Sequence, residues 1–213
     1  NAWKQAGAMG LIIKDSGVQA VYGPKADVLK SDIQDLLESG VAIPRTEVVS
    51  TNTATSETKF KGITEAVYSV ADGQAVSITE VKDPVFAQKM MGDGYAVEPV
   101  NGNVYAPVSG TVTSVFPTKH AVGILSDQGV EVLVHVGLDT VALNGAPFST
   151  KVADGQHVQA GDLLLVADLD AIRSADRETT IVVAFTNSAE IKSVSLVNLR
   201  QVSKDSQVAI VEL

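Results

Sequence analysis

The chain has 213 residues, of which 45% are hydrophobic, and its formal net charge at pH 7 is −9. An acidic surface repels nucleic-acid phosphates and anionic lipid, which argues against both as partners. The apolar runs are much shorter than the roughly 20 residues that span a bilayer, so we expect no membrane insertion by this fragment. The sequence contains no cysteine, which excludes disulfides, thiolate zinc sites and a cysteine nucleophile. We expect a soluble, cytoplasmic protein.

The charge is unevenly distributed, which indicates more than one structural unit. Residues 1–61 carry seven basic and seven acidic residues, whereas residues 62–213 carry nine and eighteen. The whole net charge therefore lies in the second part. We predict a small, partial α+β segment at residues 1–40, a flexible linker at 41–61 and a larger domain at 62–213.

Residues 1–40 contain too few elements for a stable core. Two short apolar runs at 11–13 and 18–22 predict a pair of strands, and apolar residues at helical spacing from Val28 to Leu37 predict a helix. The stretch from Pro44 to Thr58 is polar and poor in large apolar side chains, which is typical of a linker. An exposed loop of the following domain is the alternative.

Residues 62–213 show short apolar runs broken by glycine and no long amphipathic helix. This pattern favours a β-sandwich or a β-barrel. Short helical turns are expected at 84–91 and 170–177. The fold class predicted for the whole chain is mainly β.

Two of the three histidines lie where strands are expected. Alternation would place Phe116, Thr118 and His120 on one face of a strand, and His135 on a later strand. The segment between the two histidines has the pattern of a hairpin, so we expect the imidazoles to face each other. His157 lies in a turn-rich stretch and is expected on the surface without a role.

Valines at 132, 134 and 136 would fill the opposite face of the later strand and anchor His135. A single strand histidine is more often structural, but a facing pair favours chemistry. Two histidines are an incomplete zinc site, because a catalytic zinc needs a third protein ligand. Alternatively, one imidazole is a nucleophile that attacks phosphorus, while its neighbour binds the phosphoryl oxygens.

Three segments resemble a known family: Asp83–Gly94 (DPVFAQKMMGDG), Val104–Thr111 (VYAPVSGT) and Val134–Val141 (VHVGLDTV). They are similar to the glucose-type enzyme IIA of the bacterial sugar phosphotransferase system. The resemblance extends to the C-terminus. It implies an antiparallel β-sandwich that works as a phosphoryl carrier, with a phosphohistidine intermediate and no required cofactor.

The resemblance also implies partners and residue roles. His135 would accept a phosphoryl group from the small carrier protein HPr and pass it to a cysteine of enzyme IIB, for coupled sugar uptake and phosphorylation. His120 would donate a hydrogen bond to the phosphoryl group, Thr118 would orient His120, and the Gly137 carbonyl would hold the protonated nitrogen of His135. Zinc would bind His120 and His135 only if a partner supplied a third ligand.

A partner-binding rim is implied as well. Its apolar members would be Phe86, Met91, Phe116, Leu133 and Val141, and its acidic members Asp83 and Asp139. Ordinary core packing is the alternative for each apolar member.

The N-terminal segment resembles the end of a glucose-type enzyme IIB at Gly17–Gly23 and Lys25–Lys30. It has no cysteine and cannot perform the IIB transfer. An enzyme IIB tail followed by enzyme IIA is the order found in membrane sugar permeases, which would place the chain at the cytoplasmic face of the membrane. We expect glucose-type transport.

Three other function classes compete with the carrier. A zinc-dependent β-fold hydrolase would carry a close His-x-His pair and a carboxylate ligand, whereas Val136 and Gly137 follow His135. A biotinyl or lipoyl carrier module is suggested by the glycine spacing of residues 152–161, but no lysine occupies a suitable hairpin tip. A regulatory module that binds target proteins is compatible with phosphoryl transfer.

Overall fold

The structure is a computed structural model that describes residues 10–14, 17–21 and 62–213. The chain divides into two compact units, residues 1–59 and 60–213. In the first unit, β1 (Gly10–Lys14) pairs antiparallel with β2 (Gly17–Val21), which confirms the two predicted strands. The predicted helix from Val28 and the predicted linker at 41–61 lie outside the described residues.

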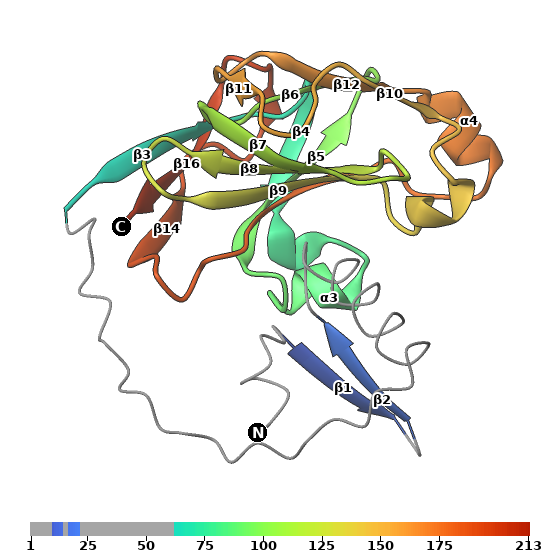
Figure 1. Ribbon diagram of the computed structural model, residues 1–213, viewed down its shortest axis with the longest axis horizontal. Coiled ribbons are helices and arrows are strands. Elements are labelled where there is room, and N and C mark those ends of the chain that lie inside the picture. Colours follow the sequence, from blue (N-terminus) through green and yellow to red (C-terminus); the bar gives the residue numbers. More distant parts are fainter. Residues whose placement is uncertain (1–9, 15–16, 22–61) are drawn as a thin grey trace, which may run out of the picture. The chain divides into compact units, whose positions relative to one another are not determined.

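The second unit consists mainly of short strands, which Figure 1 shows wrapped around a common core. The strands are β3 (Thr64–Tyr68), β4 (Gly73–Ser77), β5 (Asp93–Pro99), β6 (Asn103–Tyr105), β7 (Gly110–Val115), β8 (Ala121–Ser126), β9 (Glu131–Val136), β10 (Phe148–Thr150), β11 (His157–Val158), β12 (Leu163–Ala167), β13 (Ile181–Phe185), β14 (Ser193–Leu196), β15 (Gln201–Val202) and β16 (Gln207–Glu212). The helical segments are η2 (Ile78–Glu80), α3 (Pro84–Ala87), η3 (Thr140–Leu143) and α4 (Leu169–Ser174). The helical turns predicted at 84–91 and 170–177 are confirmed, with shorter bounds.

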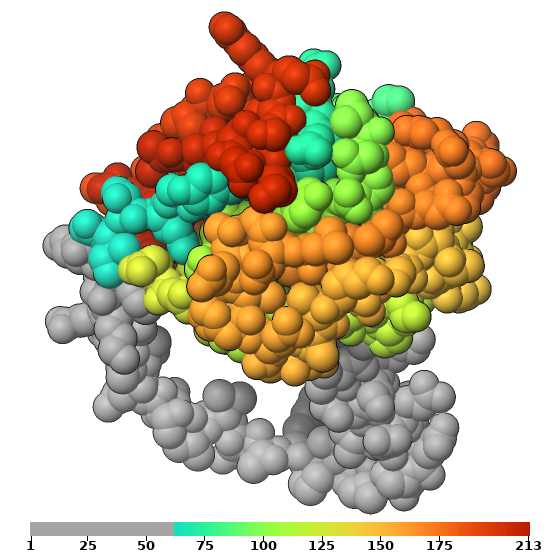
Figure 2. All heavy atoms as spheres, turned by 90° about the horizontal axis from the view of Figure 1, so that it is seen from above, coloured from blue at the N-terminus to red at the C-terminus, as the bar shows by residue number. Residues whose placement is uncertain are grey.

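Three antiparallel sheets make up this unit. The largest has the order β11-β7-β8-β9-β13-β5-β4-β15, and the two smaller ones have the orders β10-β12-β6 and β14-β16-β3. Because β3 pairs with β16, the beginning and the end of the unit share a sheet. In Figure 2 the teal segment that contains β3 lies against the red C-terminal strands. This arrangement confirms the predicted antiparallel β fold.

The core lies on one face of the large sheet. Alternation along β9 directs Val132, Val134 and Val136 into this core, where each is at most 2% exposed. Leu133 and His135 consequently lie on the opposite face. The valines therefore anchor the histidine strand, as the sequence predicted.

Candidate functional site

The two predicted histidines lie on neighbouring strands. β8 pairs antiparallel with β9, and Ala121 at the start of β8 is opposite His135. The backbone N–H of Val136 donates to the carbonyl of His120 at 2.7 Å. His120 is therefore held one residue before β8, beside the end of the strand that carries His135.

The two imidazole rings contact each other edge to face. Their centroids are 4.8 Å apart and their planes differ by 81°. His120 is buried, and His135 retains part of its surface to solvent. The expectation that two imidazoles face each other is confirmed.

The backbone between Phe116 and His120 differs from the prediction. β7 ends at Val115, and residues 116–120 form a turn in which the Lys119 N–H donates to the Phe116 carbonyl at 2.7 Å. Lys119 has a positive φ of 55°. The prediction that Phe116, Thr118 and His120 alternate along a strand is therefore wrong, because the chain turns before it reaches them.

The turn still brings Thr118 onto His120. Thr118 Oγ1 and His120 Nδ1 share a hydrogen bond of 2.6 Å. A hydroxyl that donates to Nδ1 would place the ring proton on Nε2, because a neutral imidazole carries only one N–H. The predicted contact between Thr118 and His120 is thus present in the structure.

His135 is neutral at pH 7. Burial first and the nearby His120 second lower the pKa of His135 to about 3, and a backbone interaction with Gly137 acts in the opposite direction. Nδ1 of His135 is buried and has no hydrogen bond of ordinary geometry, so the Gly137 interaction is a weak one. A neutral ring retains a lone pair, which nucleophilic attack requires.

Two aromatic rings flank the histidines. Phe86 packs edge to face on His135 with centroids 5.2 Å apart, and Phe116 does the same on His120 at 5.5 Å. Phe86 is placed by α3, whose N-cap Asp83 accepts hydrogen bonds from the N–H groups of Val85 and Phe86 at 2.7 and 3.4 Å. Asp83 therefore helps to orient one aromatic neighbour of His135.

The predicted rim residues differ in exposure. Phe86, Met91 and Leu133 are largely buried, whereas Val141 is 53% exposed. Phe116 and Asp83 are intermediate, and Asp139 is exposed. The roles of these residues in partner binding remain predictions.

A cavity of about 230 Å³ lies where the two predicted acidic rim residues meet. Its lining residues are Lys82, Asp83, Pro84, Leu138, Asp139, Asp176, Arg177 and Glu178. Lys82 donates a hydrogen bond to Glu178 Oε1 at 2.7 Å, and both side chains are exposed. The cavity thus carries more acidic than basic side chains.

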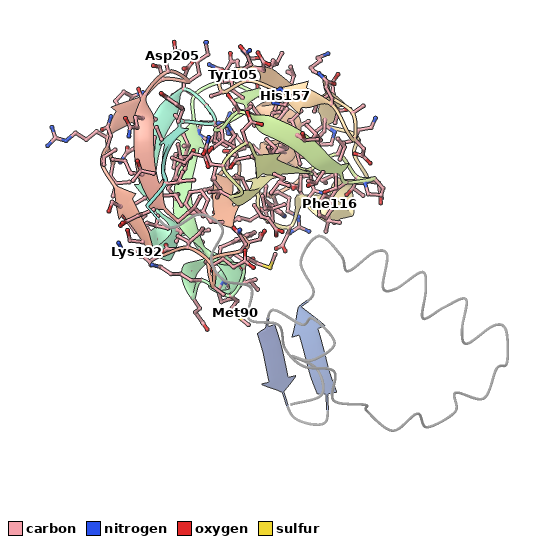
Figure 3. The ribbon with its side chains drawn as sticks, turned by 60° about the vertical axis from the view of Figure 1, so that its left-hand side comes forward. Met90, Tyr105, Phe116, His157, Lys192 and Asp205 are labelled. Carbon is pink, nitrogen blue, oxygen red and sulfur yellow. The ribbon has the colours of Figure 1, made fainter. Side chains whose placement is uncertain are left out.

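His157 lies apart from the pair. It is exposed, begins β11, and forms an ion pair with Asp127 at 3.1 Å when protonated. In Figure 3 His157 is labelled near Tyr105, whereas Phe116 is labelled on the side towards Met90. This placement agrees with the expected surface position.

Sequence reasoning missed Thr140. This residue is 0% exposed, and its hydroxyl donates to the Val136 carbonyl at 2.6 Å. Its position inside the segment Val134–Val141, which carries part of the family resemblance, was the available signal. The threonine contacts the backbone that follows His135.

Over residues 62–213 and the two N-terminal strands, no three His, Cys, Asp or Glu side chains are grouped so that they could hold a metal ion. The same part of the chain contains no helix long and apolar enough to cross a membrane.

Comparison with known proteins decides the family. The model of the family described as "phosphoenolpyruvate-dependent sugar phosphotransferase system, EIIA 1" matches residues 65–191. The chain belongs to this family. Its β domain is therefore a phosphoryl-carrying EIIA domain of glucose type.

Similar proteins agree with this assignment. A glucose-specific EIICBA component of Streptococcus pneumoniae is 63% identical over 212 residues, which cover 99% of this chain and 29% of the relative. A glucosamine-specific EIICBA component of Bacillus subtilis is 41% identical over 187 residues, which cover 88% of this chain and 29% of the relative. The chain thus spans about 29% of the length of these relatives.

A solved structure supports the EIIA fold. Glucose permease IIA from Mycoplasma capricolum is 38% identical, with a TM-score of 0.64, and the match covers 70% of this chain and 96% of that one. The antiparallel β-sandwich predicted from the sequence is confirmed by this likeness.

Proposed function

We propose that His135 of this EIIA domain accepts a phosphoryl group through Nε2 and passes it to the cysteine of an enzyme IIB domain, with phospho-HPr as the donor. The observation that carries the proposal is the contact between His120 and a neutral His135 whose Nδ1 is buried. Burial of Nδ1 leaves Nε2 as the nitrogen that a phosphoryl group can approach. Protein–protein transfer of this kind requires no cofactor.

The transfer is an in-line displacement at phosphorus. The Nε2 lone pair of His135 forms the new P–N bond, while the P–N bond to the donor histidine breaks and its electron pair returns to the donor imidazole. Nδ1 of His135 keeps its proton, which the Gly137 carbonyl would stabilise. In the onward step, the P–N bond breaks and the acceptor thiolate forms a P–S bond.

His120 would stabilise the charge on the transferring group. A hydroxyl of Thr118 that donates to Nδ1 leaves Nε2–H of His120 as a donor to a phosphoryl oxygen. Phosphoryl transfer depends chiefly on positioning and on stabilisation of charge. The two histidines therefore have different roles, as nucleophile and as donor.

The substrate of the complete protein is inferred from the relatives. The names of the similar EIICBA components specify glucose and glucosamine. We infer that the chain works at the cytoplasmic face of a glucose-type permease, where it supplies an enzyme IIB domain.

Reconstitution of the relay tests the proposed function. Enzyme I, HPr and ³²P-labelled phosphoenolpyruvate should transfer acid-labile label to the parent chain. His135→Gln should abolish labelling, because an amide is not a nucleophile. His157→Gln is the matched control, since it replaces an exposed histidine outside the pair, and it should label like the parent.

A second variant separates the two roles. His120→Gln should accept label but transfer it more slowly to a complete enzyme IIB, because His120 stabilises charge and forms no bond to phosphorus. Labelling of His135→Gln at the parental level would refute the assignment of the acceptor. A parental onward rate in His120→Gln would remove His120 from the mechanism.

A further inference from the structure

We infer that Thr140 is a positioning residue for the phosphoryl acceptor, because it fixes the backbone that presents the Gly137 carbonyl to His135. This inference rests on the proposed function only for its kinetic consequence. Its structural consequence, a change in the state of the His135 imidazole, can be tested without phosphoryl transfer.

The Val136–Gly137 peptide is held from both sides. The N–H of Gly137 donates to the Thr180 carbonyl at 3.0 Å, and the carbonyl of Val136 accepts the Thr140 hydroxyl at 2.6 Å. This peptide lies one residue beyond His135, where β9 ends. Together with the dihedrals of Gly137, its orientation sets the direction of the next carbonyl, which belongs to Gly137. The peptide that contains this carbonyl is also held by the Leu138 N–H, which donates to the Glu178 carbonyl at 3.1 Å.

The methyl group of Thr140 acts on the same peptide unit. A Cβ built on Gly137 would lie 2.4 Å from Thr140 Cγ2, so the methyl group packs directly against the Gly137 Cα. Gly137 adopts a positive φ of 76°, which a glycine tolerates and most residues do not. The hydroxyl and the methyl group of one buried threonine therefore contact both residues of this peptide, Val136 and Gly137.

The position of the Gly137 carbonyl affects the imidazole of His135. Its Nδ1 is buried without a hydrogen bond of ordinary geometry, although the Gly137 backbone still interacts with the ring. A small displacement of the Gly137 carbonyl would decide whether Nδ1–H is bonded. That bond in turn fixes the tautomer in which Nε2 holds the attacking lone pair.

Two substitutions separate the branches of Thr140. Thr140→Val keeps the shape and removes the hydroxyl, whereas Thr140→Ser keeps the hydroxyl and removes the methyl group. Ser126→Ala is the control for general loss of stability, since Ser126 is buried at the far end of β8 and its hydroxyl donates to Glu65.

The first readout is the His135 ring itself, observed by ¹H–¹⁵N correlation NMR of the complete chain. In Thr140→Val the ring ¹⁵N shifts should report a mixture of tautomers, whereas Thr140→Ser and Ser126→Ala should retain the parental tautomer. Parental ring ¹⁵N shifts in Thr140→Val would overturn the inference, even if this variant were less stable than the parent.

The second readout is the rate of labelling by phospho-HPr. Thr140→Val should lower kcat by about tenfold with little change in KM, as expected for a misplaced acceptor and an intact docking surface. Thr140→Ser should stay within about twofold of the parent. If the parent itself accepted no label, the proposed function would fail. The NMR readout would still test whether Thr140 controls the tautomer of His135.

Discussion

The imidazoles of His120 and His135 meet edge to face because Val136, the residue after His135, donates its backbone N–H to the carbonyl of His120. A ladder hydrogen bond between β9 and the turn before β8 thus sets the separation of the two rings. The geometry of the two side chains therefore depends on the register of the backbone.

The pH dependence of stability should reveal the lowered pKa of His135. In the unfolded chain a histidine titrates near pH 6.5, whereas in the folded chain burial and His120 lower its pKa to about 3. Between these values the unfolded state binds the extra proton, so stability falls as the pH decreases.

Denaturant unfolding of the parent and of His135→Gln at two pH values measures this effect. From about pH 7 to about pH 5 the parent should lose about 1–2 kcal/mol more stability than the variant. Equal losses in the two proteins would show that His135 titrates normally in the folded chain.

Thr118 should control the orientation of His120. Thr118→Val keeps the shape of the side chain but removes the hydroxyl that bonds Nδ1 of His120. It should slow onward transfer by about tenfold, because a His120 ring that is not oriented stabilises the phosphoryl charge poorly. Thr118→Ser should restore most of the rate. Rapid-quench transfer to enzyme IIB provides the measurement, and parental rates in Thr118→Val would contradict this role.

Gly137→Ala should destabilise the fold by about 2–4 kcal/mol, through left-handed strain and overpacking. The added Cβ would lie 2.4 Å from Thr140 Cγ2 and 2.8 Å from the Glu178 carbonyl oxygen. Gly155→Ala is the matched control, since Gly155 has a similar φ of 79° and nothing within 4 Å of its added Cβ. Equal losses of unfolding free energy in the two variants would show that the contact with Thr140 is unimportant.

Residues 62–213 should fold and accept label without the preceding segment. All strands from β3 onward and both histidines lie in this range. A chain that begins at Gly62 should unfold cooperatively and label at a rate close to that of the full chain. Loss of folding or of labelling would show that residues 1–61 support the carrier domain.

The sequence predicted the parts of this structure that depend on local pattern. Alternation in β9 correctly separated the core valines from His135, and the motifs around Asp83 and His135 indicated the family. The turn at residues 116–120 was missed, because it depends on a positive φ at Lys119 that the sequence does not mark with a glycine. Thr140 was missed as well, since its contact with the Val136 carbonyl depends on the path of the chain after Gly137.

In the proposed mechanism His135 carries the phosphoryl group on Nε2. Phosphorylation of the complete chain by phospho-HPr, followed by peptide mapping and ³¹P–¹⁵N NMR of the imidazoles, tests it most directly. We expect a single acid-labile phosphoryl group on Nε2 of His135, with His120 and His157 unmodified. A phosphoryl group on His120, or on Nδ1 of His135, would contradict it.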